Sequence, residues 1–168
     1  MDLYILRHGI AEDRGKTSGK PDSQRHLTAE GEEKMRRVAE GMKSLGLEID
    51  LILSSPYLRA KQTAEIVAEV FNLGRCLEMS DDLTPSGNPR TVIDALNESH
   101  SDRESVVLVG HEPYLSSLIS LLISGGTGLA ITLKKGGLCK LVIEQHLKYG
   151  RCASLEWLLA PRHAKKLG

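Results

Sequence analysis

Aromatic residues and cysteines are both scarce in this sequence, and each shortage narrows what the chain can be. Phe, Trp and Tyr together make up 4% of the 168 residues, so Leu, Ile and Val must fill any core. The cysteines are three in number, and no two of them form a C-x-x-C pair. An odd count without that spacing argues against a disulfide framework and against a zinc knuckle.

The sequence also lacks a net charge and a long apolar run. Its 22 basic and 22 acidic residues cancel, so broad attraction to nucleic acid or to an anionic membrane has no support, and any anion site must be local. No stretch approaches the ~20 apolar residues of a membrane helix, and the apolar run near Met1 is too short for a signal peptide. We therefore expect a cytoplasmic protein without a nucleic-acid or membrane partner.

Short apolar runs alternate with amphipathic segments over the first two thirds of the chain. Three of these runs are predicted to be buried strands: residues 3–6, 51–53 and 105–109. A predicted helix follows each strand. The first helix has Thr28 as its N-cap, the second has Ser55 as its N-cap with Pro56 in the first position, and the third opens at Pro113.

The last third of the chain consists of apolar segments separated by turn residues. Residues 129–133, 138–143 and 153–158 predict edge strands or a meander. No repeat or linker interrupts the chain, so we expect a single domain over residues 1–168. The earlier β-α-β alternation predicts an α/β fold, a three-layer sandwich with a mainly parallel central sheet and helices on both faces.

Polar clusters stand where three of the predicted strands end, which is the side of an open α/β sheet where ligands bind. They are Arg7-His8-Gly9, the segment 54–59 that ends in Arg59, and the segment 110–113 that contains His111. Arg59 falls in the first turn of a helix, where the positive end of the dipole disfavours a cation. A surface arginine would tolerate that cost, whereas a bound anion would make the same position favourable. We favour the anion site because Arg7 and two histidines occupy equivalent positions.

A single histidine just after a buried strand is more often structural than catalytic, but the neighbours of His8 suit a nucleophilic imidazole. Gly9 beside it leaves room for a ligand to approach the backbone closely. A neutral imidazole can attack phosphorus with one nitrogen if the other donates its proton to a carbonyl or a carboxylate. Arg7 and Arg59 would then stabilise charge on the phosphoryl oxygens, and His111 would supply a further donor. This scheme needs no metal and no cofactor.

Together the three clusters resemble the histidine phosphatase superfamily, which has the phosphoglycerate mutase-like fold. The matching segments are Arg7-His8-Gly9, Ser54-Ser55-Pro56-Tyr57-Leu58-Arg59-Ala60-x-Gln62-Thr63 and Gly110-His111-Glu112-Pro113. Within that superfamily the chain is most similar to the small SixA-type phosphohistidine phosphatases. The elements that carry this closer similarity are Arg25-x-Leu27-Thr28-x-x-Gly31, Leu83-Thr84-Pro85-x-Gly87 and Trp157-Leu158-Leu159-x-Pro161.

The resemblance implies a role for each residue of the candidate site. His8 is the implied nucleophile. Arg7, Arg59 and His111 are implied to bind the phosphoryl group, and Arg25 matches an additional pocket arginine of the family. The implied substrate is a histidine-phosphorylated protein of the phosphotransfer-domain type, and the implied product is inorganic phosphate.

The loop over residues 84–88 is informative because it contains no carboxylate. Many superfamily members place a glutamate or aspartate there as general acid for an alkoxide leaving group, a contribution of typically about 10²–10⁴-fold. A phosphorylated imidazole leaves readily once solvent protonates its ring, so the missing acid favours phosphohistidine. Asp81, Asp82 or Glu112 could serve instead, which keeps a small-molecule phosphomonoesterase open as an alternative. A non-catalytic phosphoryl-binding module is a third hypothesis.

Overall fold

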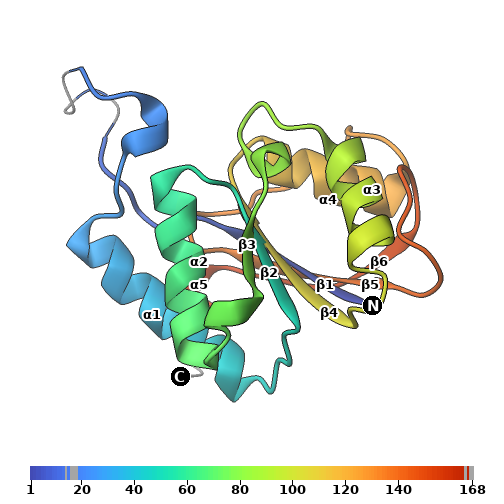
Figure 1. The fold of residues 1–168 in the computed structure, drawn as a ribbon, viewed down its shortest axis with the longest axis horizontal. Coiled ribbons are helices and arrows are strands. Elements are labelled where there is room, and N and C mark those ends of the chain that lie inside the picture. Colours follow the sequence, from blue (N-terminus) through green and yellow to red (C-terminus); the bar gives the residue numbers. More distant parts are fainter. Residues whose placement is uncertain (14, 16–18, 165, 167–168) are drawn as a thin grey trace.

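The computed structural model describes residues 1–13, 15, 19–164 and 166. Its centre is a six-stranded sheet in the order β3-β2-β4-β1-β5-β6 (Figure 1). The strands are β1 (Asp2–Arg7), β2 (Leu51–Ser54), β3 (Leu77–Met79), β4 (Ser105–Gly110), β5 (Leu138–Ile143) and β6 (Ala153–Leu159). Strands β1 to β4 pair in parallel, while β5 runs antiparallel to β1 and β6 antiparallel to β5.

Helices cover both faces of this sheet. They are α1 (Ala29–Ser44), α2 (Leu58–Phe71), α3 (Pro89–Ser99), α4 (Tyr114–Ser124) and α5 (Pro161–Ala164), with short 3₁₀ turns η1 (Asp22–Gln24), η2 (Gly74–Cys76) and η3 (Asp81–Leu83). Figure 1 shows α1 and α2 on one side of the sheet and α3 and α4 on the other. The predicted α/β fold with a mainly parallel sheet is therefore confirmed.

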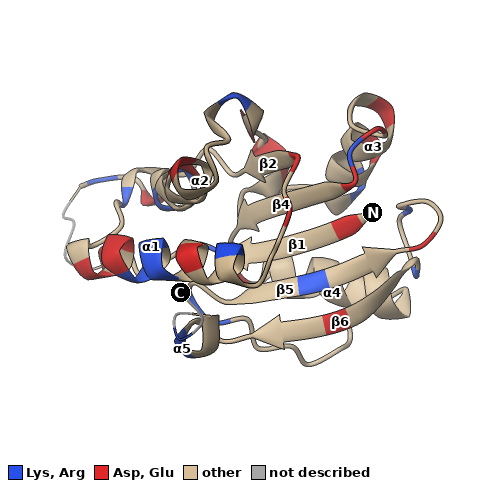
Figure 2. Cartoon of the chain, turned by 90° about the horizontal axis from the view of Figure 1, so that it is seen from below, with Lys and Arg blue, Asp and Glu red and all other residues tan. Residues whose placement is uncertain are grey.

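Alternation along the strands divides the core into two layers. On β1, Leu3 and Ile5 belong to the apolar cluster with α3 and α4, whereas Tyr4 and Leu6 belong to the cluster with α1 and α2. This is the two-residue period of a strand that is buried on both faces. Charged residues lie mainly on the helices and loops, and the strands are largely uncharged (Figure 2). No helix in the described residues is long and apolar enough to cross a membrane.

The start of α1 is as predicted, but the start of α2 is not. Thr28 caps α1, since its Oγ1 accepts a hydrogen bond from the amide of Gly31 at 3.0 Å. The prediction that Ser55 caps the second helix, with Pro56 in its first position, is wrong, because α2 begins at Leu58 and Tyr57 is its N-cap. The Ser55 hydroxyl instead lies 2.8 Å from Nε2 of His111 and accepts a hydrogen bond from the Tyr57 amide.

The strand predicted over residues 129–133 is also wrong, since that segment has no regular secondary structure. The sheet ends at β3 and β6, and residues 129–133 pair with neither of these edge strands. The segment makes irregular contacts instead. The Leu129 amide donates to the Ser120 hydroxyl at 3.0 Å, and the Leu133 carbonyl accepts a hydrogen bond from Nη1 of Arg7 at 2.9 Å.

Candidate active site

The carboxyl ends of β1, β2 and β4 bring the predicted site residues together. Arg7 ends β1 and His8 follows it, Arg59 lies in the first turn of α2 after β2, and His111 follows β4. These four line one pocket of about 360 Å³ together with Arg25, which follows η1. We call it the phosphoryl pocket. The complete lining is Arg7, His8, Glu12, Asp13, Arg25, Arg59, Pro85, His111, Glu112 and Lys135.

The hydrogen bonds of His8 define its tautomer. Its Nδ1 lies 2.7 Å from the carbonyl oxygen of Gly9, and Nε of Arg59 donates to its Nε2 at 3.2 Å. A carbonyl can only accept, so Nδ1 carries the proton and Nε2 presents a lone pair. Burial lowers the pKa of His8 to about 2, an effect that the Gly9 hydrogen bond opposes and the charge of Arg59 reinforces. His8 is thus a neutral imidazole at pH 7, with Nε2 able to attack an electrophile.

Arg59 and Arg25 are held in place by one carboxylate, that of Asp22. Arg59 is only 2% exposed, and it donates from Nη1 to the Asp22 carbonyl at 2.7 Å and from Nη2 to the Asp22 carboxylate at 3.0 Å. Arg25 reaches the other carboxylate oxygen at 2.9 Å from Nε and Nη2. Burial raises the pKa of Asp22, but the nearby charges and hydrogen bonds of the two arginines outweigh it and lower the pKa to about 2. Asp22 is therefore ionised and fixes both guanidinium groups.

Arg7 and His111 each keep a buried nitrogen without a hydrogen-bond partner among the described residues. These atoms are Nε of Arg7 and Nδ1 of His111. His111 is 1% exposed, its ring centroid lies 5.0 Å from that of His8, and burial lowers its pKa to about 3. Buried polar groups in native proteins are nearly always satisfied, so orphaned nitrogens beside two fixed arginines suit an anionic ligand with several acceptor oxygens.

Gly9 does not line the phosphoryl pocket. A Cβ at this position would lie 2.6 Å from Cγ of Met35, so the packing of α1 against the loop already requires a glycine. The Gly9 amide donates to Oγ1 of Thr63 at 3.1 Å, and the same hydroxyl donates to the Arg59 carbonyl at 2.7 Å. Thr63 thus ties the backbone beside His8 to the first turn of α2. The expected contact between Gly9 and substrate stays a prediction.

Three positioning residues were not singled out from the sequence as parts of the site. Asp22 stands three residues before Arg25, a spacing at which an acid and a base can pair, and this was the only local signal. Thr63 lies inside the segment that resembles the family but carries no chemistry of its own. Ser55 was predicted to cap a helix, and only the tertiary structure brings its hydroxyl to His111.

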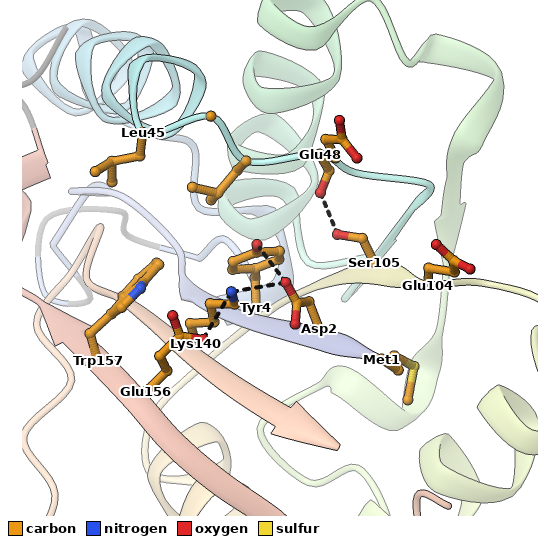
Figure 3. Close-up of a pocket in the computed structure, with 12 residues that line it drawn as sticks. Met1, Asp2, Tyr4, Leu45, Glu48, Glu104, Ser105, Lys140, Glu156 and Trp157 are labelled. Carbon is orange, nitrogen blue, oxygen red and sulfur yellow. Dashed lines mark hydrogen bonds and ion pairs between the residues drawn. The ribbon is translucent and has the colours of Figure 1, made fainter. Parts of the chain in front are cut away.

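The opposite end of the parallel strands carries a larger cavity of about 560 Å³ (Figure 3). Tyr4 and Trp157 stand across it with ring centroids 6.1 Å apart. Lys140 lies between two carboxylates, with Nζ 2.9 Å from Asp2 and 2.9 Å from Glu156. Its cation is already matched by acids of the same wall, so this cavity lacks the convergent unmatched donors of the phosphoryl pocket.

Comparisons with known proteins agree with this geometry. The family model described as histidine phosphatase superfamily (branch 1) matches residues 3–84. Phosphohistidine phosphatase SixA of Escherichia coli K12 is 34% identical over 128 residues, which are 76% of this chain and 77% of that protein. An uncharacterized protein of Picosynechococcus sp. is 39% identical over 142 residues, 84% of each chain. The solved structure of the protein histidine phosphatase SixA complexed with tungstate superposes with a TM-score of 0.81 at 29% identity, covering 97% of this chain and 99% of that one.

Proposed function

The chain belongs to the histidine phosphatase superfamily as a SixA-type phosphatase, and from this premise we propose that it removes phosphoryl groups from histidine-phosphorylated protein through a phosphorylated His8. The observation that carries the proposal is the tautomer of His8. The Gly9 carbonyl holds the proton on Nδ1, so Nε2 keeps its lone pair, which accepts a hydrogen bond from Nε of Arg59. When Nε2 attacks, that N–H is released and can donate to a phosphoryl oxygen instead.

The first step transfers the phosphoryl group to the enzyme. Nε2 of His8 forms a bond to phosphorus while the P–N bond to the substrate imidazole breaks, and the leaving ring nitrogen takes a proton from solvent. Arg7, Arg25 and Arg59 bind the phosphoryl oxygens, and Nδ1 of His111 donates to one of them when it carries the proton. The bond from Nδ1 of His8 to Gly9 keeps the ring aligned throughout.

The second step releases inorganic phosphate. Water attacks phosphorus as the bond to Nε2 of His8 breaks, which returns the neutral imidazole and passes the proton of the water to solvent or to the phosphate. The same arginines stabilise the charge on the oxygens in both steps, because the two displacements occur at one phosphorus position. The low pKa of His8 favours its neutral form between turnovers.

The proposed substrate class rests on the loop over residues 84–88, which contains no carboxylate to act as a general acid. Within residues 84–88 the pocket is lined by Pro85, which has no proton to give. A histidine-phosphorylated protein, such as a phosphotransfer domain, suits this pocket because its leaving imidazole needs no protein acid. The cytoplasmic location and the single domain over residues 1–168 stay predictions.

Glu112 favours a second candidate, a small-molecule phosphomonoesterase. Its side chain lines the phosphoryl pocket, whereas Asp81 and Asp82, the other acids considered from the sequence, do not. Oε1 of Glu112 accepts a hydrogen bond from the Ser116 amide at 3.0 Å, so this oxygen is engaged by the first turn of α4. This contact argues against Glu112 as a general acid, and we place the phosphomonoesterase second. A non-catalytic module is not retained, since the chain is a phosphatase.

Rates on matched substrates separate the two candidates. The proposal predicts that kcat/KM for a phosphohistidine domain exceeds that for alkyl phosphates such as sugar phosphates by at least about 100-fold, the lower range of general-acid effects. Glu112→Gln is the accompanying variant. A preference for alkyl phosphates that Glu112→Gln abolishes would contradict the proposal and establish the phosphomonoesterase.

A further inference from the structure

A tight turn is hydrogen-bonded to the backbone at the end of β1, next to His8. Residues 134–137, which we call the Lys135 turn, read Lys134-Lys135-Gly136-Gly137. The Gly136 amide lies 3.0 Å from the Arg7 carbonyl and 3.1 Å from the His8 carbonyl, and the Arg7 amide donates to the Gly137 carbonyl at 3.1 Å. Gly136 has a φ of +73°, which a side chain would strain. The turn is thus fixed relative to His8.

Lys135 stands between two cavities. It lines the phosphoryl pocket, and it also lines a neighbouring cavity of about 200 Å³, which we call the side cavity. The lining of the side cavity is Gly9, Ile10, Lys34, Met35, Val38, Lys135, Gly136, Pro161 and Arg162. Its walls are mostly apolar and its charged residues are all basic, so it complements a ligand that joins an apolar group to an acidic one.

Lys135 is the cation of this set that lines the phosphoryl pocket as well. Lys34 forms an ion pair with Glu30, and Nε of Arg162 donates to the His163 ring at 3.1 Å. The Lys135 side chain is exposed and makes no hydrogen bond or ion pair within the part of the chain that the structure describes. The fixed turn places its Cα, and the flexible stem lets the ammonium group reach along the rim.

We propose that Lys135 and the side cavity together recognise the protein surface around the phosphohistidine, which deepens the proposed function and rests on it. While the phosphoryl group lies among the arginines, an apolar side chain next to the phosphohistidine enters the side cavity. A carboxylate on the same surface pairs with Lys135. A small phosphomonoester fills the phosphoryl pocket and has no group left for the side cavity, so this surface selects a protein substrate.

Two synthetic phosphohistidine peptides test this arrangement. One carries Leu and Glu beside the phosphohistidine, and its partner carries Ser at both positions. We expect wild type to prefer the Leu–Glu peptide by about tenfold in kcat/KM, with most of the Glu contribution lost at high salt, as for a rim ion pair. Lys135→Gln is expected to remove the part of the kcat/KM preference that comes from the Glu of the peptide. Ile10→Ser is expected to remove the part that comes from its Leu. Lys134→Gln, on the same turn but in neither lining, is the matched control and keeps the full preference.

Two results would overturn the inference. One is an unchanged preference in Lys135→Gln. The other is an equal loss in that variant for both peptides and for free phosphohistidine, which would make Lys135 a ligand of the phosphoryl group. The dissociation constants of both peptides are measured alongside, in wild type and in each variant. If wild type binds the Leu–Glu peptide preferentially and releases no phosphate, the proposed function fails while this inference is supported.

Discussion

At the carboxyl end of the parallel strands buried cations converge on one pocket, whereas at the amino end half-exposed charges pair with one another. At each end a basic side chain forms an ion pair with a carboxylate. Arg59 is 2% exposed and bonds Asp22 and the ring of His8, while Lys140 is 16% exposed and lies between Asp2 and Glu156 (Figure 3). At the amino end one cation meets two carboxylates. At the carboxyl end one carboxylate, that of Asp22, bonds two arginines, and the lining of the pocket also holds Arg7 and Lys135 beside Glu12, Asp13 and Glu112.

The difference shows that a cavity by itself does not mark the site. The amino-end cavity is the larger, at about 560 Å³ against about 360 Å³. Its lining holds more carboxylates than cations, so an anion gains little there. The smaller pocket holds two guanidinium groups that Asp22 fixes and two buried nitrogens without a partner among the described residues. Out of water, each interaction of such donors with an anion is stronger.

The largest effect is expected from Arg59→Met. This change removes a buried guanidinium that touches Nε2 of His8, so it loses a donor to the phosphoryl oxygens and the contact that orients the nucleophile. We expect kcat/KM on a phosphohistidine protein to fall by about 10²–10³-fold, the usual cost of one oxyanion donor. Steady-state phosphate release measures it. A loss of kcat/KM below fivefold, in a variant whose circular dichroism is native, would contradict the proposal that Arg59 binds the phosphoryl group.

Acid should destabilise the fold through the two buried histidines. Burial lowers the pKa of His8 to about 2 and of His111 to about 3, against 6.5 for the ordinary imidazole. Below pH 6.5 the unfolded chain therefore binds two more protons than the folded one, and stability falls as the pH drops toward 3. Each histidine lowers the free energy of unfolding by about 1.4 kcal/mol for each pH unit of acidification, so the two together lower it by about 3 kcal/mol per pH unit.

Urea unfolding at several pH values between 7 and 4 checks this slope. His8→Asn is the control. It should reduce the slope of unfolding free energy against pH by about 1.4 kcal/mol per pH unit, the contribution of one histidine. Other groups contribute equally to both proteins, so the difference isolates His8. Equal slopes for wild type and variant would show that His8 titrates normally in the folded protein.

A smaller effect is expected from Thr63→Val. The valine has nearly the same shape but leaves the buried Gly9 amide without its acceptor, so the free energy of unfolding should fall by about 1–3 kcal/mol. Thr63→Ser keeps the hydroxyl, and in denaturant unfolding it should retain most of that stability. If Thr63→Val is as stable as wild type while Thr63→Ser is not, the methyl packing and not the hydrogen bond would account for the stability at this position.

The smallest effect is expected from Lys140→Met at the amino end. Its ion pairs reach the surface, where such pairs contribute about 1 kcal/mol or less. Stability should change by no more than that, and kcat/KM should stay at the wild-type value. A tenfold loss of activity would mean that the amino end is coupled to the phosphoryl pocket.

The layers of the fold and the meeting of the polar clusters at one edge of the sheet could be predicted because their signals are local. Apolar runs marked β1, β2 and β4, and polar residues directly after them marked the edge where His8, Arg59 and His111 meet. The helix start at Ser55 and the strand over 129–133 were predicted wrongly for a shared reason. The conformation of both segments depends on hydrogen bonds to residues distant in the sequence. Ser55 contacts His111, and the carbonyl of Leu133 accepts a hydrogen bond from Arg7.

Positioning residues were harder to predict because they act through other residues. Thr63 matters only because Gly9 and Arg59 bond the same hydroxyl, and Asp22 only because it reaches Arg59 across 37 positions. The backbone bonds of Gly136 to Arg7 and His8 are what place Lys135 beside the pocket. Pairings of this kind depend on tertiary structure and leave little mark on local sequence.

The phosphorylated state of His8 tests the central claim most directly. Wild type is mixed with a phosphohistidine protein, quenched within milliseconds in alkali, which preserves phosphohistidine, and mapped by peptide mass spectrometry. The account predicts a phosphoryl group on the peptide containing His8 that forms before phosphate is released and is absent from His8→Asn. Phosphate release at the wild-type rate from His8→Asn, or a transient phosphoryl group on any other residue, would contradict it.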